Sequence, residues 1–266
     1  MQTIAGDLLE TIVAATRRAV ESRAHVVPPA VLETRIAREP DGDAFRHALR
    51  SSPAPRIIAE CKRRSPSRGI LRADYDPAAH AAAYAANGAA AISVLTEPTF
   101  FDGSLDHLAS VRGAVPLPIL RKDFIVDRYQ LLEAAAHGAD AILLIVGAVD
   151  DRSLAQLVRQ TRELRLAALV EVHDGVELER ALTSGADVVG VNSRNLRTLS
   201  VDHAVLDELV TRIPSGITAV AESGIRSEAD ITRLTALGYH AFLVGERLIA
   251  EPDPGRALRA LRGSIA

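Results

Sequence analysis

The chain has 266 residues, of which 48% are hydrophobic and 24% charged, so it can fold around a large core. Its formal net charge of -3 gives no overall positive field, which argues against nucleic acid or an anionic membrane surface as a partner. Cys61 is the only cysteine, so neither an intrachain disulfide nor a cysteine-rich metal site can form.

Residues 3–24 carry apolar side chains at helical spacing and predict an amphipathic helix. Asp7 and Glu10 interrupt the apolar core that a signal peptide needs, and no apolar run reaches the about 18 residues of a membrane span. We therefore expect a cytoplasmic protein without a membrane or nucleic-acid partner. The segment that follows has five prolines and one short helical stretch over 43–50, so we expect 1–55 to be a helical extension packed on the main fold.

The stretch 57–62 (IIAECK) starts with apolar residues of strand type and ends with Glu60 and Lys62. Side chains two residues apart point to the same side of a strand, so this acid and this base share one face. Charges at the end of a buried strand are unfavourable unless they pair or take part in chemistry. One such pair alone is more simply a salt-bridged strand end, but polar strand ends recur along the chain.

A repeated signal organises the rest of the chain: a helix that ends in glycine, followed after two or three residues by an apolar strand. The glycines are Gly88, Gly138, Gly185 and Gly238, at intervals of 50, 47 and 53 residues. Each stands where a helix C-terminus favours a left-handed residue. Between consecutive copies there is room for one further strand and helix.

The intervening strands are predicted at 118–122, 167–172 and 217–222, and 57–62 leads the series. Alternating helices and nearly continuous apolar strands indicate a parallel sheet covered by helices. Eight strands in this length predict a closed (β/α)8 TIM barrel, so we expect 1–266 to be one barrel domain with 56–266 as the barrel proper. An open doubly wound sheet would favour a GxGxxG turn after the first strand, and RRSPSRG does not match it.

The carboxyl ends of barrel strands form one rim, so polar residues at strand ends are candidates for a shared pocket. These candidates are Glu60, Lys62, Thr96, Glu97, Lys122, Asp123, Glu171, Asn192, Arg194, Glu222, Ser223, Gly245 and Glu246. Lysines and glutamates around one pocket can act as general acids and bases. Taken singly, Lys122 could be a lysine at the edge of the core and Glu171 a helix cap. The scattered histidines show no ligand spacing and are interpreted as surface or packing residues, so we expect no metal site.

Two small turns indicate where a phosphate could bind. Residues 221–225 (AESGI) and 244–246 (VGE) end the predicted seventh and eighth strands just before helices. In such barrels these loops, with free backbone N–H groups, often hold phosphate, although ordinary glycine turns would look the same.

The sequence resembles the indole-3-glycerol phosphate synthase family of tryptophan biosynthesis over nearly its whole length. The resemblance is carried by LETIVAATRRAVESR, IIAECKRRSPSRG, ILRKDFIVDRYQLLEAAAHGADAILLIV, LVEVHD, VGVNSRNLRTLSVD, AESGI and FLVGE. It implies a lyase that closes 1-(2-carboxyphenylamino)-1-deoxyribulose 5-phosphate to indole-3-glycerol phosphate with loss of carbon dioxide and water. It implies no metal and no organic cofactor.

The resemblance also implies residue roles. Lys122 matches the general acid of ring closure, and Lys62, Glu60 and Glu171 match the groups of the later dehydration, with the choice of the base left open. Asn192 and Ser223 match residues that orient substrate hydroxyls and catalytic side chains, and Glu222 matches a residue near the sugar hydroxyls. The phosphate end is matched by Ser65, Arg194, Gly224, Gly245 and Glu246.

Two departures from the family pattern leave every proposed catalytic group in place: Ser193 replaces a common Asn, and Arg247 a common Ser or Gly. The alternatives are another phosphosugar barrel, such as phosphoribosylanthranilate isomerase, or a non-catalytic barrel that binds a metabolite. The first does not need two lysines on the first and third strands, and the second has no reason to bury charges. The sequence leaves open whether the protein is a monomer or a homodimer.

Overall fold

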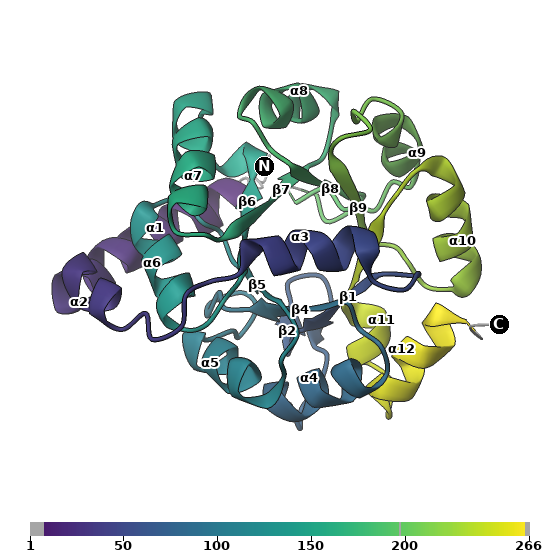
Figure 1. Cartoon of the computed structure of the whole chain (residues 1–266), viewed down its shortest axis with the longest axis horizontal. Coiled ribbons are helices and arrows are strands. Elements are labelled where there is room, and N and C mark those ends of the chain that lie inside the picture. Colours follow the sequence, from purple (N-terminus) through teal and green to yellow (C-terminus); the bar gives the residue numbers. More distant parts are fainter. Residues whose placement is uncertain (1–7, 197, 264–266) are drawn as a thin grey trace, which may run out of the picture.

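The computed structural model describes residues 8–196 and 198–263, in which eight parallel strands close into a barrel (Figure 1). In order around the barrel they are β1 (Ile57–Cys61), β4 (Ala91–Leu95), β5 (Ile119–Lys122), β6 (Ala141–Ile145), β7 (Ala167–Val172), β8 (Val188–Asn192), β9 (Thr218–Glu222) and β10 (Ala241–Val244). The ring closes where β10 pairs with β1. The predicted (β/α)8 barrel is confirmed, and β1, β5, β7 and β9 lie within a residue of their expected bounds.

Helices follow the strands and form the outer ring. They are α4 (Pro77–Ala86), α5 (Leu105–Ala114), α6 (Arg128–Ala136), α7 (Asp151–Glu163), α8 (Gly175–Thr183), α9 (Ala204–Val210), α10 (Glu228–Leu237), α11 (Glu246–Ile249) and α12 (Pro254–Arg262), with a short 3-10 turn η1 (Val146–Ala148). Most begin at an Asp or Ser whose side chain accepts a backbone N–H of the first turn, as at Asp150 and Ser227. The loop after β1 contains an unpredicted hairpin of β2 (Arg64–Ser65) and β3 (Gly69–Ile70). None of the described helices is long and apolar enough to cross a membrane.

The four repeated glycines all adopt left-handed backbone conformations, with φ of 88° at Gly88, 87° at Gly138, 85° at Gly185 and 116° at Gly238. The helix-end prediction is therefore confirmed at each copy. Three residues after each glycine the chain enters a barrel strand, which is β4, β6, β8 and β10 in turn.

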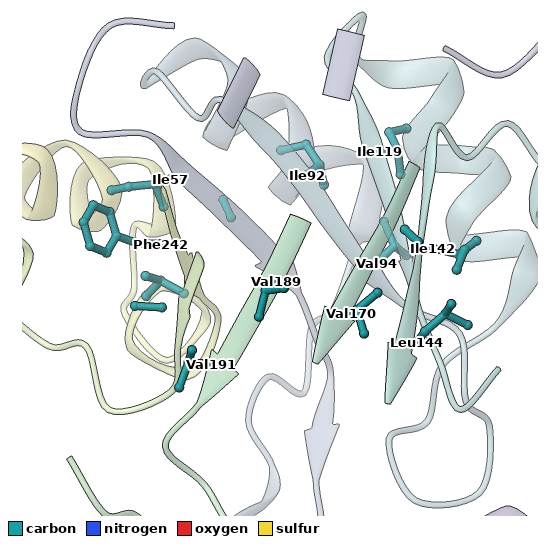
Figure 2. Packing of buried hydrophobic residues seen from close by; sticks show 14 of the residues in the cluster. Ile57, Ile92, Val94, Ile119, Ile142, Leu144, Val170, Val189, Val191 and Phe242 are labelled. Atoms are coloured by element: carbon teal, nitrogen blue, oxygen red, sulfur yellow. The ribbon is translucent and has the colours of Figure 1, made fainter. Parts of the chain in front are cut away.

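Side chains alternate between the two faces of every strand. Those facing outward, such as Ile92, Leu144 and Val170, pack under the helices in the layer shown in Figure 2. Those facing inward, such as Leu120 and Leu169, fill the barrel interior. The inward series of β1 continues from Ile58 through Glu60, so the same alternation that builds the core delivers polar side chains to the carboxyl rim.

The N-terminal extension contacts the barrel at both ends. Helix α1 (Leu8–Val26) begins beside η1 at the carboxyl rim, and α2 (Pro29–Thr34), which was not predicted, packs on α6. Helix α3 (Gly42–Ser51) crosses the opposite opening, in front of the strands in Figure 1, and buries Phe45 and Leu49 in the barrel interior. The helix predicted over 3–24 is confirmed from residue 8 onward, and residues 3–7 lie outside the described part of the chain.

The residue two positions after a repeated glycine anchors this extension. Asp140 Oδ1 lies 2.6 Å from Arg38 Nη1 and its Oδ2 lies 3.1 Å from Arg112 Nη1. Asp187, the same position of the next copy, lies 2.9 Å from Arg46 Nε. The copies differ in burial, since the side chain of Asp140 is 1% exposed and that of Asp187 is 39% exposed.

We expect Asp140→Ala to lower the free energy of unfolding by about 3–5 kcal/mol, because it removes a buried carboxylate that pairs with Arg38 and Arg112 and accepts the buried backbone N–H of Ile119. Asp187→Ala, the matched control, should cost no more than about 1 kcal/mol because its ion pairs are solvated. Urea denaturation monitored by circular dichroism measures the free energy of unfolding of both variants. Equal losses in the two variants would show that burial at this repeat position does not decide its contribution.

Candidate active site

A cavity of about 430 Å³ opens at the carboxyl ends of the strands. It is lined by all twelve residues for which the family resemblance implies a role: Glu60, Lys62, Ser65, Lys122, Glu171, Asn192, Arg194, Glu222, Ser223, Gly224, Gly245 and Glu246. They come from five strands and from the loops after β1, β8, β9 and β10. Side chains up to 186 positions apart in the sequence therefore share one small space.

Glu60 and Lys62 form a close ion pair on the wall that β1 contributes. Lys62 Nζ lies 2.5 Å from Glu60 Oε1, and the Glu60 side chain is almost wholly buried. Gly245 allows this placement, because a side chain at position 245 would overlap Glu60 Oε1. The glycine that the sequence assigned to the phosphate end thus also makes room for a carboxylate.

Lys122 lies between two further glutamates. Its Nζ is 3.1 Å from Glu171 Oε2 and 3.4 Å from Glu222 Oε2. Burial alone would lower the pKa of Lys122, but the carboxylates of Glu171, Glu222 and Glu60 more than offset it and raise the pKa well above its usual value. Lys122 is therefore a cation throughout the physiological range.

The two glutamates beside Lys122 differ in protonation. Burial opposes ionisation of Glu171, yet Lys122 and then His173 hold the pKa of Glu171 well below its usual range. Burial, with repulsion from Glu171 and Glu60, raises the pKa of Glu222 to about 8 despite the attraction of Lys122. The pair therefore favours an ionised Glu171, while Glu222 holds its proton more tightly than an ordinary glutamate.

Asn192, Arg194 and Ser223 form a hydrogen-bonded corner where β8 and β9 end. The Ser223 hydroxyl donates to Asn192 Oδ1 at 2.7 Å, and the Arg194 backbone N–H donates to the same oxygen at 2.9 Å. Ser223 and Gly224 both have positive φ, 65° and 71°, so the chain turns sharply here. The amide oxygen of Asn192 is thereby fixed, and its NH₂ group is the side that hydrogen-bonds Glu171.

The phosphate end predicted from the glycine turns lies on the same side of the cavity as this corner. Glu246 Oε1 lies 3.5 Å from Arg68 Nε, and its Oε2 lies 3.9 Å from Arg194 Nη2. Ser65, on the hairpin after β1, faces Ser67 at 3.4 Å between hydroxyl oxygens. This end of the cavity thus collects two arginines together with hydroxyl and backbone donors.

Two strand-end predictions are wrong. Thr96 and Glu97 do not line the cavity, because Leu95 takes the inward position at the end of β4. Thr96 instead donates to Asp123 at 2.5 Å in a buried network, and Glu97 accepts the backbone N–H of Phe100 at 2.7 Å. Both side chains therefore form hydrogen bonds that stabilise the loops near their own strand ends and do not face the cavity.

An apolar wall and one histidine of the site were not predicted from the sequence. The wall consists of Leu8, Leu9, Ile12, Phe101, Phe124, Leu143, Ile145, Leu196 and Leu243, some of which the inward alternation of the strands could have identified. His173 lies 3.3 Å from Glu171 through Nε2, so it is not merely a surface or packing residue. Its position two residues after Glu171 was the available signal. Among residues 8–196 and 198–263, no three His, Cys, Asp or Glu side chains are grouped as metal ligands would be.

Gly190, which faces inward on β8, is expected to tolerate no side chain. A Cβ there would overlap Glu222 Oε1 and lie 3.2 Å from Leu169 Cδ1. We expect Gly190→Ala to lower stability by about 1–3 kcal/mol and turnover by roughly tenfold or more, because Glu222 is displaced beside Lys122. Gly113→Ala is the matched control: it is exposed on α5 with open space around it, and should stabilise the helix by about 0.5–1 kcal/mol. Thermal unfolding measures the stability of both variants, and steady-state kinetics measure their turnover. Wild-type turnover in Gly190→Ala would contradict the expected displacement of Glu222.

Solved structures with the same architecture are distant in sequence. A 3-hexulose-6-phosphate synthase superposes with a TM-score of 0.63 at 16% identity, covering 79% of this chain and 100% of that one. A thiamine phosphate pyrophosphorylase from Pyrococcus furiosus gives 0.61 at 18% identity, covering 82% and 96%. At these identities the likeness shows the fold alone.

Sequence comparison is more specific. The family model described as indole-3-glycerol phosphate synthase matches residues 9–261. The indole-3-glycerol phosphate synthase of Parafrankia sp. (strain EAN1pec) is 49% identical over 248 residues, 92% of this chain and 91% of the relative. The protein of that name from Micrococcus luteus is 46% identical over 261 residues, 97% of each chain. The chain therefore belongs to the indole-3-glycerol phosphate synthase family, whose members are carboxy-lyases.

Proposed function

We propose that this chain converts 1-(2-carboxyphenylamino)-1-deoxyribulose 5-phosphate to indole-3-glycerol phosphate, carbon dioxide and water. One observation carries the proposal: a largely buried lysine, Lys122, lines a single cavity together with an apolar wall and an arginine-bearing corner. The substrate has the same polarity, with an aromatic ring at one end, a phosphate at the other and a ketone between them. A barrel for phosphoribosylanthranilate isomerisation is not favoured by the family match.

In the proposed first step Lys122 is the general acid. The ring carbon that bears the carboxylate bonds to the ketone carbon, and the carbonyl electron pair moves to oxygen. The Lys122 ammonium donates a proton to that oxygen, which is basic enough to accept it from a lysine of raised pKa. The carboxylate then leaves as carbon dioxide, and the electrons of the broken bond restore the aromatic ring.

The second step removes water from the resulting hydroxylated ring. An acid must protonate the departing hydroxyl, and a base must take a proton from the neighbouring carbon. We assign the acid to Lys62, with Glu60 and Glu171 as the candidate bases, because the Glu60–Lys62 pair and Glu171 face the same cavity as Lys122.

The remaining residues position the substrate. We propose that Asn192 and Ser223 orient its hydroxyls and that Glu222 hydrogen-bonds the sugar chain. Ser65, Arg194, Gly224, Gly245 and Glu246 would hold the phosphate, the last two through backbone N–H groups.

A direct assay tests the function. The purified protein is incubated with the synthetic carboxyphenylamino substrate while indole fluorescence and carbon dioxide release are followed. We expect equal amounts of both products. Absence of turnover, together with conversion of phosphoribosylanthranilate under the same conditions, would replace this proposal by the isomerase.

The pKa of Glu222 predicts the alkaline side of the pH profile. A protonated Glu222 can donate to a substrate hydroxyl and adds no charge to a phosphorylated ligand, so kcat/KM should fall as pH rises through about 8. Glu222→Gln mimics the protonated acid and should remove this fall. The raised pKa also means that the contribution of Glu222 to stability is complete below pH 4.5 and is lost as pH rises towards 8. An unchanged alkaline limb in Glu222→Gln would assign it to another group.

One chain supplies every residue of the proposed site, so we propose that a monomer is competent and that a homodimer would carry two independent sites. Light scattering at assay concentrations distinguishes the two states. We also propose that the protein works in the cytoplasm on this small phosphorylated substrate without a nucleic-acid partner.

A further inference from the structure

His173, just beyond the end of β7, lies between two carboxylates. Its Nε2 is 3.3 Å from Glu171 Oε1, an ion pair without the alignment of a hydrogen bond. Its Nδ1 is 3.0 Å from Glu177 Oε2, and its backbone N–H donates to the same oxygen at 2.8 Å. Each ring nitrogen therefore faces one acid, and the side chain is only 13% exposed.

This arrangement fixes the charge on the ring. Burial alone would lower the pKa of His173, but Glu171 and Glu177 outweigh it and raise the pKa to about 10. Both nitrogens then carry protons at neutral pH, which is what two facing carboxylates require. The charged groups around the ring are Glu171 from β7 and Glu177 from α8, with Lys122 from β5 beyond Glu171.

Glu177, the carboxylate on the side of His173 away from Glu171, is itself held by a backbone hydrogen bond. Glu177 is the third residue of α8, whose N-cap is Asp174, and it reaches back to the backbone of His173. Its Oε1 occupies the space next to Gly147, where a Cβ would lie 2.8 Å from Glu177 Oε1 and 3.3 Å from Leu9 Cδ2. Glu177 has little freedom to move, so it holds His173 in place.

Glu171 consequently has a cation at each oxygen. Lys122 meets Oε2 on the cavity side, and His173 meets Oε1 on the side of α8. Asn192 also hydrogen-bonds Glu171, but among the described residues His173 is the only cation within ion-pair distance of Oε1, so its loss removes the charge that opposes Lys122 across the carboxylate.

We propose that His173 is a positioning residue, which holds the Glu171 carboxylate against Lys122 and thereby sets the geometry of the proton donor. This inference rests on the proposed function of Lys122 and Glu171. His173 itself does not line the cavity, so we place it behind Glu171 and not among the groups that contact the substrate.

Two substitutions separate positioning from a structural role. In His173→Gln the side-chain amide can reach the site of Nε2 and donate to Glu171, whereas in His173→Asn it can reach only the site of Nδ1 and Glu177. We expect His173→Asn to lower kcat on the order of tenfold or more, the effect of losing a charged contact, with KM changed less than about twofold. His173→Gln should recover most of kcat. His47→Asn, on the exposed face of α3 at the other end of the barrel, controls for loss of a histidine.

A spectroscopic readout makes the test independent of turnover. Lys62 and Lys122 are the only lysines in the sequence, so protein labelled with ¹³C-lysine has two CεH₂ signals, assigned with Lys62→Arg. His173→Asn should shift the Lys122 signal and leave that of Lys62 in place, and His173→Gln should shift it less.

The outcomes are distinct. If the wild type does not convert the substrate, the proposed function fails, but the Lys122 signal still reports whether His173 holds Glu171. If Asn and Gln variants have equal kcat and an unmoved Lys122 signal, His173 only caps α8 and the inference is overturned.

Discussion

Replacing Lys122 by methionine is expected to lower kcat by about 10³-fold or more, within the range that a general acid contributes. The substitution keeps the length and apolar stem of the side chain but removes the proton that the forming oxyanion needs. KM should change little, because the apolar wall and the phosphate end remain. Rapid-quench measurement of carbon dioxide release locates the loss in ring closure itself.

Lys122→Arg is the matched variant, because it keeps the cation between Glu171 and Glu222. Arginine stays protonated in proteins and cannot deliver the proton, so activity should remain low while stability is largely preserved. In Lys122→Met the two glutamates lose their shared cation, their pKa values rise, and the folded state binds protons more tightly than the unfolded one. Its stability should therefore decrease as pH rises above about 4.5, relative to the wild type. Wild-type turnover in Lys122→Met would remove the lysine from the mechanism.

The strands could be predicted from the sequence because their pattern depends only on neighbouring residues. Apolar runs that follow a left-handed glycine mark the strands, and period-two alternation places Glu60 and Lys62 on one inward face. The same alternation explains the error at Thr96, which is one residue past the inward Leu95 and so points towards the helices. Applying the period to each strand end, instead of collecting every polar residue there, would have excluded it.

The packing of the N-terminal helix α1 on the barrel could not be predicted from the sequence. The apolar wall receives Leu9 and Ile12 from α1, a helix whose docking depends on distant ion pairs. Arg23 Nε lies 2.6 Å from Glu133, and Glu133 in turn lies 3.2 Å from the buried Arg121, the neighbour of Lys122 in β5. No spacing in the sequence links these residues, because the contact exists only after the barrel has closed.

Glu60 and Glu171, the two candidate bases of dehydration, differ in the number of cations that contact them. Glu171 is held by two cations, Lys122 and His173, which keep it ionised but make it a weak proton acceptor. Glu60 has a single recorded cationic contact among the described residues, Lys62 at 2.5 Å, which is also the proposed acid of the same step. We therefore expect Glu60 to take the proton.

Glu60→Gln should release carbon dioxide at close to the wild-type rate in a single turnover but form indole about 10²-fold or more slowly, so that the hydroxylated intermediate accumulates. Glu171→Gln should slow both products together, because it loosens Lys122 before ring closure. Both substitutions preserve shape, and folding is checked by circular dichroism. Quench-flow with separate detection of carbon dioxide and indole distinguishes the two patterns, and accumulation of the intermediate in Glu171→Gln but not in Glu60→Gln would reverse the assignment. The order of events in the cavity would then follow from the contacts of each carboxylate: the one with two cations serves ring closure through Lys122, and the one paired with Lys62 completes the elimination.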